Sequence, residues 1–334
     1  MVDLKQAELL LKRFEEISLL ALGDVYLDEY VLGRVTQISE EAPVPVFVHK
    51  ESLFTPGAMA NVANNVRSLG ADVELIGVLG RDEAGKQALR ELKDRKIGSK
   101  GLFIDESRPT THKVKYLAGS DERSYQHVFR FDKESRSPLH APLERQVLRF
   151  LKDYLPSVHG MIVSDYRNGV VTEKILRECI RLGKRGKKIV TADSRGNLLD
   201  YEGVTAITPN RAEVAVSCKR PVVTDEDVCR EGKHFRERLK AEAFIITCGK
   251  DGMWIFEKRK RPLHIPALKV EEVADVTGAG DTVLATLTVA LAAGADMALA
   301  ASLANVAAGL VVKKLGAATV NRGEILEALS LTHR

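Results

Sequence analysis

The sequence is poor in cysteine, and its cysteines show no pairing pattern. The chain has 334 residues and four cysteines, Cys179, Cys218, Cys229 and Cys248, without a C-x-x-C pair or a histidine at the spacing of a zinc site. A disulfide framework and a zinc centre are therefore not indicated, and a reduced, cytoplasmic chain is the simplest interpretation. No histidine is placed to activate Cys248, which we interpret as a small buried residue.

A large charge of one sign and a long apolar run are also lacking. Lys and Arg number 50 against 46 Asp and Glu, a formal net charge of +4, which disfavours a polybasic arm for nucleic acid. The longest strongly apolar stretch, Val283–Ala293, is far shorter than the ~20 residues of a membrane-spanning helix. Met1–Glu16 has no apolar segment typical of a secretory signal. At 45% hydrophobic and 29% charged residues, the composition is that of a soluble globular protein.

Short apolar runs alternate with helical patterns along most of the chain. Ile17–Leu22 is typical of a buried parallel strand, and it is followed by a helical pattern at Met59–Leu69 and a strand pattern at Asp72–Val78. The same alternation returns between Gly160 and Thr247. It predicts an α/β fold with a mainly parallel central sheet and helices on both faces.

Two stretches, at about 26–49 and 110–132, break this alternation because they offer no helical period. We expect their strands to pair in a small antiparallel sheet that forms a β lid. No linker or repeat sets the lid apart, so residues 1–334 are predicted to be a single domain. Pairing of two subunits would cover the exposed lid edges, which favours a homodimer through the lid.

The segment DVTGAGD, Asp275–Asp281, comes directly before the apolar run. Small residues at the start of a helix leave backbone N–H groups free to bind an anion, so Gly278, Ala279 and Gly280 are candidates for a phosphate-binding hole. A carboxylate beside that hole is explained if Asp281 accepts a proton from the group that attacks the phosphate. We expect the helix N-terminus to keep the pKa of Asp281 low. The alternative is a glycine turn whose Asp caps a core helix.

DVTGAGD resembles the second signature of the ribokinase-like, PfkB-type carbohydrate kinases, and this resemblance implies Asp281 as catalytic base. T-P-N-R-A-E at 208–213 is similar to a second motif of that family, which implies that Asn210 and Glu213 organise Mg²⁺, directly or through water, and the phosphates of ATP. From the residues alone, a helix cap with a capping-box Glu is an equal alternative. The resemblance also raises the prospect of K⁺ near Asp275.

The resemblance extends to a nucleotide loop, T-C-G-K-D-G at 247–252, in which Thr247, Gly249 and Gly252 would contact ATP. A β-turn between two strands is an equally good interpretation of this loop by itself. Asn305, in A-N-V-A-A-G, is a further nucleotide-binding candidate by the same resemblance.

The acceptor site is predicted at the other end of the chain, where carboxylates and amides suit recognition of sugar hydroxyls. Asp24 and Asp28 follow the first strand, although they are also interpretable as turn residues. Gly57, Ala58 and Asn61 resemble the first signature of the family, G-G-x-x-x-N. Ala58 departs from it, because a methyl group stands where the family has its second glycine.

Within the family, the chain resembles the heptose-7-phosphate kinases of ADP-heptose synthesis, through motifs such as G-D-V-Y-L-D-E-Y at 23–30 and Ser164-Asp165-Tyr166. The implied reaction is transfer of phosphate from ATP to O1 of D-glycero-D-manno-heptose 7-phosphate, and the chain would supply this kinase step only. Arg195 stands where those relatives have a lysine. A kinase for another sugar, sugar phosphate or nucleoside and a silent kinase fold remain alternatives, whereas no G-x-G-x-x-G supports a nicotinamide enzyme. The substrate-binding candidates of this subgroup are Lys113, Lys115, Arg123, Arg130, Asp165 and Arg195.

Overall fold

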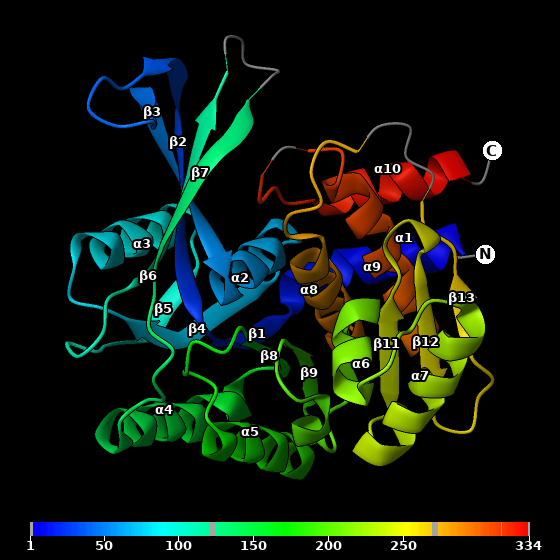
Figure 1. Ribbon diagram of the computed structural model, residues 1–334. Helices are drawn as coiled ribbons and strands as arrows, with labels where there is room; N and C mark the ends of the chain where they lie inside the picture. Colours follow the sequence, from blue (N-terminus) through cyan, green and yellow to red (C-terminus); the bar gives the residue numbers. More distant parts are fainter. Residues whose placement is uncertain (1–2, 120–124, 269–272, 315, 333–334) are drawn as a thin grey trace.

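A mainly parallel sheet forms the centre of the computed structural model, which describes residues 3–119, 125–268, 273–314 and 316–332 (Figure 1). Within these ranges the sheet has nine strands in the order β13-β12-β11-β10-β9-β8-β1-β4-β5. All neighbours from β11 to β5 are parallel, and β12 and β13 add antiparallel pairs at one edge. The strands are β1 (Ser18–Gly23), β4 (Asp72–Leu79), β5 (Gly98–Ile104), β8 (Gly160–Asp165), β9 (Ile189–Ser194), β10 (Ala206–Ile207), β11 (Ala243–Thr247), β12 (Met253–Glu257) and β13 (Leu263–Ile265).

Helices cover both faces of this sheet because its central strands are apolar on both sides. In β1, Leu19 and Ala21 belong to one buried cluster, whereas Leu20 and Leu22 belong to the other. The predicted α/β fold with a mainly parallel sheet is therefore confirmed. The first cluster joins α1 (Leu4–Lys12), α2 (Met59–Ser68), α3 (Glu83–Asp94), α8 (Ala279–Ala292), α9 (Met297–Val311) and α10 (Arg322–Thr332), and the second joins α4 (Ala141–Tyr154), α5 (Glu173–Gly186), α6 (Arg211–Cys218) and α7 (Asp225–Leu239).

A second sheet forms the lid and has the order β3-β2-β6-β7 in the described ranges. It stands above one end of the main sheet in Figure 1. The expectation of an antiparallel lid is wrong for its central pair, since β2 and β6 are parallel. Both strands leave the main sheet in the same direction, because β2 continues from β1 after Asp24 and β6 follows β5. The lid strands are β2 (Val25–Ile38), β3 (Pro45–Ala58), β6 (Thr111–Ala118) and β7 (Gln126–Lys133).

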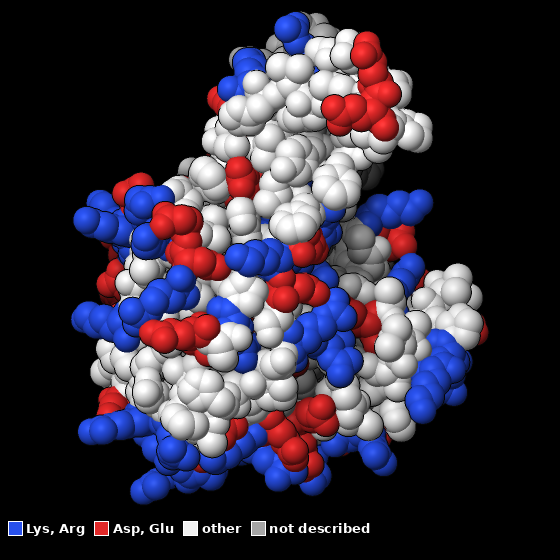
Figure 2. All heavy atoms as spheres, turned by 60° about the vertical axis from the view of Figure 1, so that its left-hand side comes forward, with Lys and Arg blue, Asp and Glu red and all other residues white. Residues whose placement is uncertain are grey.

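The two faces of the lid differ in chemistry because strand residues alternate between faces. On one face, the polar lid face, Lys113 and Lys115 of β6 lie opposite Asp28 and Tyr30 of β2 and opposite Asp132 and Arg130 of β7. The other face, the apolar lid face, carries rings and branched chains, and Phe129 and Phe131 are more than half exposed there. Figure 2 shows the contrast between a mostly uncharged lid surface and a charge-covered body. The apolar lid face consists of Val35, Phe47, Tyr116, Phe129 and Phe131.

Helix α8 contains the apolar run of the sequence and lies buried beside the sheet. It begins at Ala279, four residues before that run, so that Asp281 lies in its first turn. Among the described residues, no helix combines the length and apolarity needed to cross a bilayer. All four cysteines are free, and Cys248 is buried.

Candidate active site

Asp281 lies at the N-terminal end of α8 and is held by two side chains from other parts of the chain. The amide Nδ2 of Asn61, on α2, donates a hydrogen bond of 2.7 Å to Oδ2 of Asp281. The hydroxyl of Tyr166, from the loop after β8, donates one of 2.9 Å to Oδ1. Each carboxylate oxygen therefore has one fixed donor, and its remaining lone pairs stay free for another hydroxyl.

Burial raises the pKa of Asp281 to about 6, while the hydrogen bonds from Asn61 and Tyr166 and the charge of Arg195 oppose this rise. The expectation of a low pKa is wrong, because the loss of hydration around a carboxylate that is only 7% exposed outweighs the helix N-terminus. With a pKa near 6 the group is mostly ionised at neutral pH and holds a proton better than an ordinary aspartate. Both properties suit a general base.

The backbone beside Asp281 offers an anion-binding geometry. Among the described residues, the N–H groups of Gly280 and Asp281 have no hydrogen-bond partner, and no side chain caps the helix. A Cβ added at Gly280 would meet no atom within 4 Å, so space is open above it. Gly278 turns the chain into the helix with a φ of 81°, which favours glycine. Of the predicted hole residues, Gly280 offers a free donor among the described residues and Gly278 makes the turn, whereas the N–H of Ala279 donates to the carbonyl of Val276 at 3.3 Å.

Asp28 and Asn61 bring two unpartnered acceptor atoms to the same region. Oδ2 of Asp28 accepts a hydrogen bond of 2.9 Å from Lys115, whereas Oδ1 is buried and has no partner in the described structure. Oδ1 of Asn61 is likewise buried and unpartnered. Gly57 lets Asp28 approach, since a Cβ there would lie 2.7 Å from its Oδ1. Buried acceptors of this kind need a donor such as a hydroxyl group.

Ala58 adopts a backbone conformation that only glycine tolerates well. Its φ of 52° and ψ of −128° place it at the junction of β3 and α2. The N–H of the next residue, Met59, donates to the carbonyl of Asp24 at 3.0 Å. The family glycine at this position therefore has a backbone reason, and the alanine here is strained.

Asp24, one of the predicted sugar-binding residues, is held by the protein backbone. Its carboxylate accepts hydrogen bonds from the N–H groups of Tyr166, Asn168 and Val170 at 2.9, 3.1 and 3.2 Å. Burial raises its pKa to about 6 against these bonds. Asp24 thus anchors the loop that carries Tyr166.

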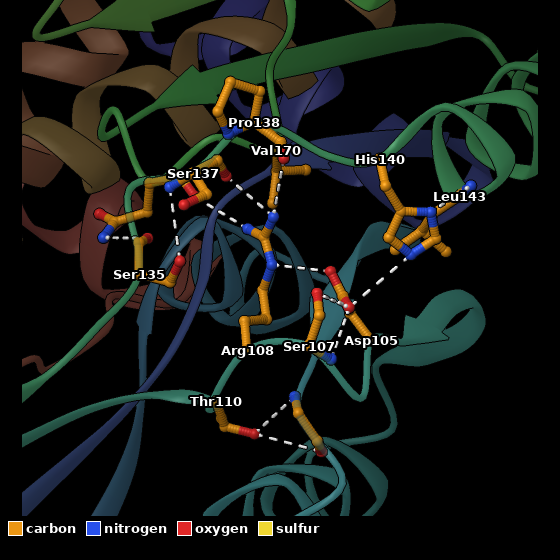
Figure 3. A network of polar contacts seen from close by, with 12 residues as sticks. Asp105, Ser107, Arg108, Thr110, Ser135, Ser137, Pro138, His140, Leu143 and Val170 are labelled. Atoms are coloured by element: carbon orange, nitrogen blue, oxygen red, sulfur yellow. Dashed lines mark hydrogen bonds and ion pairs between the residues drawn. The ribbon is translucent and has the colours of Figure 1, made fainter.

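Arg108 anchors the same loop from below the lid. Its guanidinium donates to Asp105 at 2.8 Å, to the carbonyl of Asn168 at 3.1 Å and to the carbonyl of Ser137 at 2.8 Å. Figure 3 shows this network, in which Arg108 lies between Asp105 and the 135–138 segment that follows β7. The hydroxyl of Tyr26, at the base of the lid, donates to the side chain of Asn168. The loop is therefore fixed to the roots of three lid strands.

Asp165, another predicted acceptor-site carboxylate, ends β8 just before this loop and bonds within the protein. It accepts the N–H of Arg167 at 2.8 Å and the hydroxyl of Tyr201 at 3.4 Å. Its carbonyl accepts the N–H of Arg195 at 3.0 Å. Asp165 thus braces Arg195, and Tyr166, the next residue, is the one that reaches the base.

The predicted cations differ in how they are engaged. Lys113 and Arg195 have no ion-pair partner among the described residues, and each lies over a tyrosine ring, 4.4 Å from the centroids of Tyr26 and Tyr166. Burial and the charge of Arg130 lower the pKa of Lys113. Arg130 itself forms a two-pronged ion pair with Asp132. Arg123 lies outside the described residues.

Asn210 and Glu213 form the capping box that the sequence left as an alternative. Oδ1 of Asn210 accepts the N–H of Glu213 at 2.9 Å, and Oε2 of Glu213 accepts the N–H of Asn210 at 2.8 Å. Within the described ranges, no group of three or more His, Cys, Asp or Glu side chains is arranged to hold a metal ion. Among the described residues, the other carboxylate oxygen of Glu213 has no hydrogen-bond partner, so it can accept from a water of a hydrated cation.

Glu213, Asp193 and Asp281 bring three carboxyl groups within the electrostatic influence of Arg195. Burial raises the pKa of Asp193 well above its usual range, and the charges of Glu213 and Asp281 add to this rise. Burial also raises the pKa of Glu213, against its bonds to Asn210 and the charge of Arg195. The guanidinium of Arg195 opposes the rise in pKa at all three carboxyl groups.

The predicted nucleotide loop joins β11 to β12. Its backbone closes through the N–H of Cys248, which donates to the carbonyl of Gly252 at 2.7 Å. Gly252 has a φ of 86° and packs against the carbonyl of Ile265, whereas a Cβ at Gly249 would meet no atom within 4 Å. Thr247 pairs with Asn210 in a single β-bridge, so the two predicted nucleotide segments are adjacent.

Asn305 lies elsewhere, on α9, where its Nδ2 donates to the carbonyl of Pro266 at 2.8 Å. It lines a cavity of about 1100 Å³ between α9, α10, β13 and α1. Asp281 is not among the residues that line this cavity. Asp275 braces the turn before α8, since its carboxylate accepts the N–H groups of Thr277 at 2.8 Å and Gly316 at 3.1 Å.

Sequence reasoning missed Tyr166 and Asn168 as parts of the site. The S-D-Y segment at 164–166 resembles a motif of the subgroup, but the sequence predicts Asp165 as its functional residue. A tyrosine directly after a parallel strand, at the same sheet edge as the base, was the available signal.

Comparison with known proteins places this geometry in context. The chain is 38% identical to the bifunctional protein HldE of Syntrophotalea carbinolica over 98% of its own length and 66% of that protein. It is also 38% identical to HldE of Geobacter sulfurreducens, over 99% of this chain and 67% of the relative. The chain thus spans about two thirds of the length of these curated relatives.

Solved structures share the fold. Phosphofructokinase-2 of Escherichia coli in complex with potassium superposes with a TM-score of 0.77 at 17% identity, covering 95% of this chain and 99% of that one. Arabidopsis thaliana ribokinase, complexed with ribose and ATP, gives a TM-score of 0.72 at 19% identity over 94% and 98%. The model of the pfkB family of carbohydrate kinases matches residues 18–322. The chain therefore belongs to the pfkB family and is a carbohydrate kinase, a phosphotransferase that acts on a sugar hydroxyl.

Proposed function

We propose that this kinase transfers the γ-phosphoryl group of ATP to O1 of D-glycero-D-manno-heptose 7-phosphate, with Asp281 as general base. The observation that carries the proposal is the position of Asp281. Its buried carboxylate, with a pKa raised to about 6, lies next to the free N–H groups of Gly280 and of its own backbone. A proton acceptor and an anion hole at one helix start are what phosphoryl transfer to an alcohol needs.

In this proposal the sugar hydroxyl enters between Asp281 and the unpartnered oxygens of Asn61 and Asp28. Its oxygen attacks the γ-phosphorus as the bond to the β,γ-bridging oxygen breaks, and its proton passes to the carboxylate of Asp281. The N–H groups at the start of α8 stabilise the negative charge on the transferring oxygens. ADP leaves with the bridging oxygen, which keeps the electron pair of the broken bond and its negative charge.

Mg²⁺ fits the carboxyl-rich zone near Arg195, and we assign its binding, directly or through water, to Glu213 and Asn210. The supporting observation is the position of both side chains at the start of α6, where Asn210 is bridged to Thr247 of the predicted nucleotide loop. Such an ion supplies charge neutralisation for the phosphates of ATP. Thr247, Gly249, Gly252 and Asn305 remain the proposed contacts of the nucleotide, and Asp275 remains a proposed neighbour of K⁺.

The phosphate on the acceptor is assigned to Lys113 and Arg195. Both cations lack an ion-pair partner among the described residues, and both lie over tyrosine rings that hold them at the site. Arg130 is a weaker candidate, because Asp132 already occupies its guanidinium. Heptose 7-phosphate is favoured among phosphorylated sugars because the HldE relatives match nearly the whole of this chain.

The test is ADP release with a panel of acceptors: heptose 7-phosphate, fructose 6-phosphate, ribose and a nucleoside. We expect the highest kcat/KM with heptose 7-phosphate, and loss of several orders of magnitude in kcat for Asp281→Asn with ATP affinity retained. Lys113→Met should raise the KM of the phosphorylated acceptor alone. Higher kcat/KM with an unphosphorylated sugar would overturn the substrate, and turnover retained by Asp281→Asn would overturn the base.

We also propose that two subunits pair through the apolar lid face. Phe129 and Phe131 are 59% and 51% exposed in the single chain. Exposed rings side by side on a sheet, together with unpaired edge strands, favour burial against a second copy.

A further inference from the structure

Tyr166, in the loop after β8, contacts the carboxylate of the proposed general base, Asp281. Its hydroxyl reaches Oδ1 of Asp281 at 2.9 Å, while Oδ2 is held by Asn61 at 2.7 Å. The two donors come from α2 and from the loop after β8, so they approach the carboxylate from different elements. Together they fix the plane of a group that would otherwise rotate about its terminal bond.

The ring of Tyr166 is as firmly held as its hydroxyl. The ring of Tyr26 packs edge-on against it, with centroids 5.5 Å apart, and the guanidinium of Arg195 lies 4.4 Å from its centroid. Its backbone N–H donates to the buried carboxylate of Asp24. A side chain fixed at the backbone, the ring face and the ring edge can orient its partner.

The position of the ring also depends on the base of the lid. Asn168, two residues after Tyr166, bonds through its N–H to Asp24 and through its carbonyl to Arg108. Its side chain accepts the hydroxyl of Tyr26 and donates to Glu134 at 3.3 Å, at the end of β7. The loop therefore connects the roots of the lid to the proton acceptor.

We infer that Tyr166 is a positioning residue for the proposed phosphoryl transfer: its hydroxyl orients the carboxylate of Asp281 so that a free lone pair faces the attacking sugar hydroxyl. The inference rests on the proposed function for its catalytic meaning. The contact itself exists without substrate, so it is testable apart from the reaction.

The groups around Asp281 indicate how loss of the Tyr166 hydroxyl would change the pKa of its carboxylate. Burial favours the protonated form of Asp281, and the bonds from Asn61 and Tyr166 favour the ionised form. Without the phenol, a smaller fraction of the base is ionised at neutral pH. The charged and titratable groups that face Asp281 are Asp28 on β2, Tyr166 after β8, Asp193 on β9 and Arg195 after β9.

The first test is the pH dependence of turnover for Tyr166→Phe, which keeps the ring and removes only the hydroxyl. We expect kcat to fall about tenfold or more, the KM for ATP to change less than about twofold, and the acid limb of kcat/KM to move to higher pH. Tyr154→Phe is the matched control, since the Tyr154 hydroxyl lies 3.5 Å from Glu74, in a different contact. An unchanged kcat and acid limb for Tyr166→Phe would overturn the inference.

The second test needs no substrate. Wild type, Tyr166→Phe, Asp281→Asn and the double variant form a cycle whose unfolding midpoints are measured at pH 5 and pH 8. We expect loss of the hydroxyl to lower the midpoint more when Asp281 is ionised, at pH 8, than when Asn replaces it. Additive midpoints at pH 8 overturn the positioning role. Coupled midpoints in a protein that phosphorylates no acceptor overturn the proposed function and leave the contact standing.

Discussion

Lys115 and Asp28 form an ion pair of 2.9 Å between β6 and β2, with side chains only 12% and 10% exposed. Burial lowers the pKa of Lys115, but Asp28 and Tyr30 more than offset this, so the net shift is upward. The pair keeps one oxygen of Asp28 engaged, and the other has no partner in the part of the chain that the structure describes. A central pair of the lid thus presents a single carboxylate oxygen to the acceptor region.

Replacing Lys115 with methionine leaves the carboxylate of Asp28 buried without its cation. We expect the free energy of unfolding to fall by about 3 kcal/mol, as for other nearly buried pairs that lose one partner, and the acceptor KM to rise. Urea unfolding and acceptor titration measure both effects. Lys133→Met is the control, because its ammonium is half exposed and lies 3.6 Å from Asp82; equal losses for both variants would contradict the prediction.

Asp281→Asn should alter the pH dependence of stability. The pKa of Asp281 is about 6 in the folded chain and ~3.9 in an unfolded one. Its contribution to stability is therefore fully present below about pH 4 and is lost as the pH rises through 6. Between pH 4 and pH 8 the free energy of unfolding of the wild type should fall by about 2 to 3 kcal/mol relative to that of the Asn variant, since each pKa unit corresponds to ~1.4 kcal/mol.

Urea unfolding of both proteins at pH 4.5, 6 and 8 measures this shift. Asp132→Asn is a control of opposite sign, because the bond from Arg130 lowers the pKa of Asp132. The free energy of unfolding of Asp132→Asn should fall relative to that of the wild type as the pH rises. A difference between wild type and Asp281→Asn that stays constant with pH would refute the raised pKa.

Ala58→Gly should stabilise the protein. Relief of the strain at a φ of 52° and a ψ of −128° contributes about 1 to 3 kcal/mol, and the added freedom of glycine in the unfolded chain offsets ~0.5 to 1 kcal/mol of this. We expect a net gain of about 1 kcal/mol, visible as a higher Tm. Lys187→Gly is the comparison, because Lys187 is in the ordinary left-handed region and should gain less. A lower Tm for Ala58→Gly would contradict the assignment of strain.

Gly280→Ala should lower kcat without lowering the stability of the fold. A methyl group there meets no protein atom within 4 Å, so stability should hold or rise by about 0.5 kcal/mol. The same methyl group would occupy the approach to the free N–H groups, so kcat should fall about tenfold or more.

Gly278→Ala should behave differently from Gly280→Ala. Its φ is 81° and its new Cβ would lie 2.9 Å from Nδ2 of Asn61, so the fold should lose about 1 to 2 kcal/mol. Thermal unfolding and the ADP assay on both variants measure the contrast. A Gly280→Ala enzyme with full kcat would rule out phosphate binding at this helix start.

Phe129→Glu should give a monomer if the apolar lid face joins two subunits. A charge on that face cannot be buried without a partner. Sedimentation of wild type and variant at micromolar concentration measures the mass. Val216→Glu is the control, since Val216 is 76% exposed on α6. A wild type that sediments as a monomer would contradict the proposed pairing.

The sequence allowed the layers of the fold to be predicted, because strand and helix periods are local. It also allowed Asp281 to be placed at a helix start, since the small residues before it are a local signal. The direction of its pKa shift was not predictable, because burial depends on α2, β8 and β9 packing around it. Tyr166 was missed for the same reason. Its contact with Asp281 joins residues far apart in the sequence, and it depends on the hydrogen bonds by which Asp24 holds the loop that carries Tyr166.

The alternation of side chains along β6 and β7 has a consequence for how such a protein can change over time. The cations of the polar lid face and the rings of the apolar lid face belong to neighbouring residues of the same strands. Inserting or deleting a single residue within either strand would move the side chains that follow it to the opposite face of the lid. A length change inside these strands therefore needs a bulge to restore the alternation, as at the register shift between Tyr116 and Leu117.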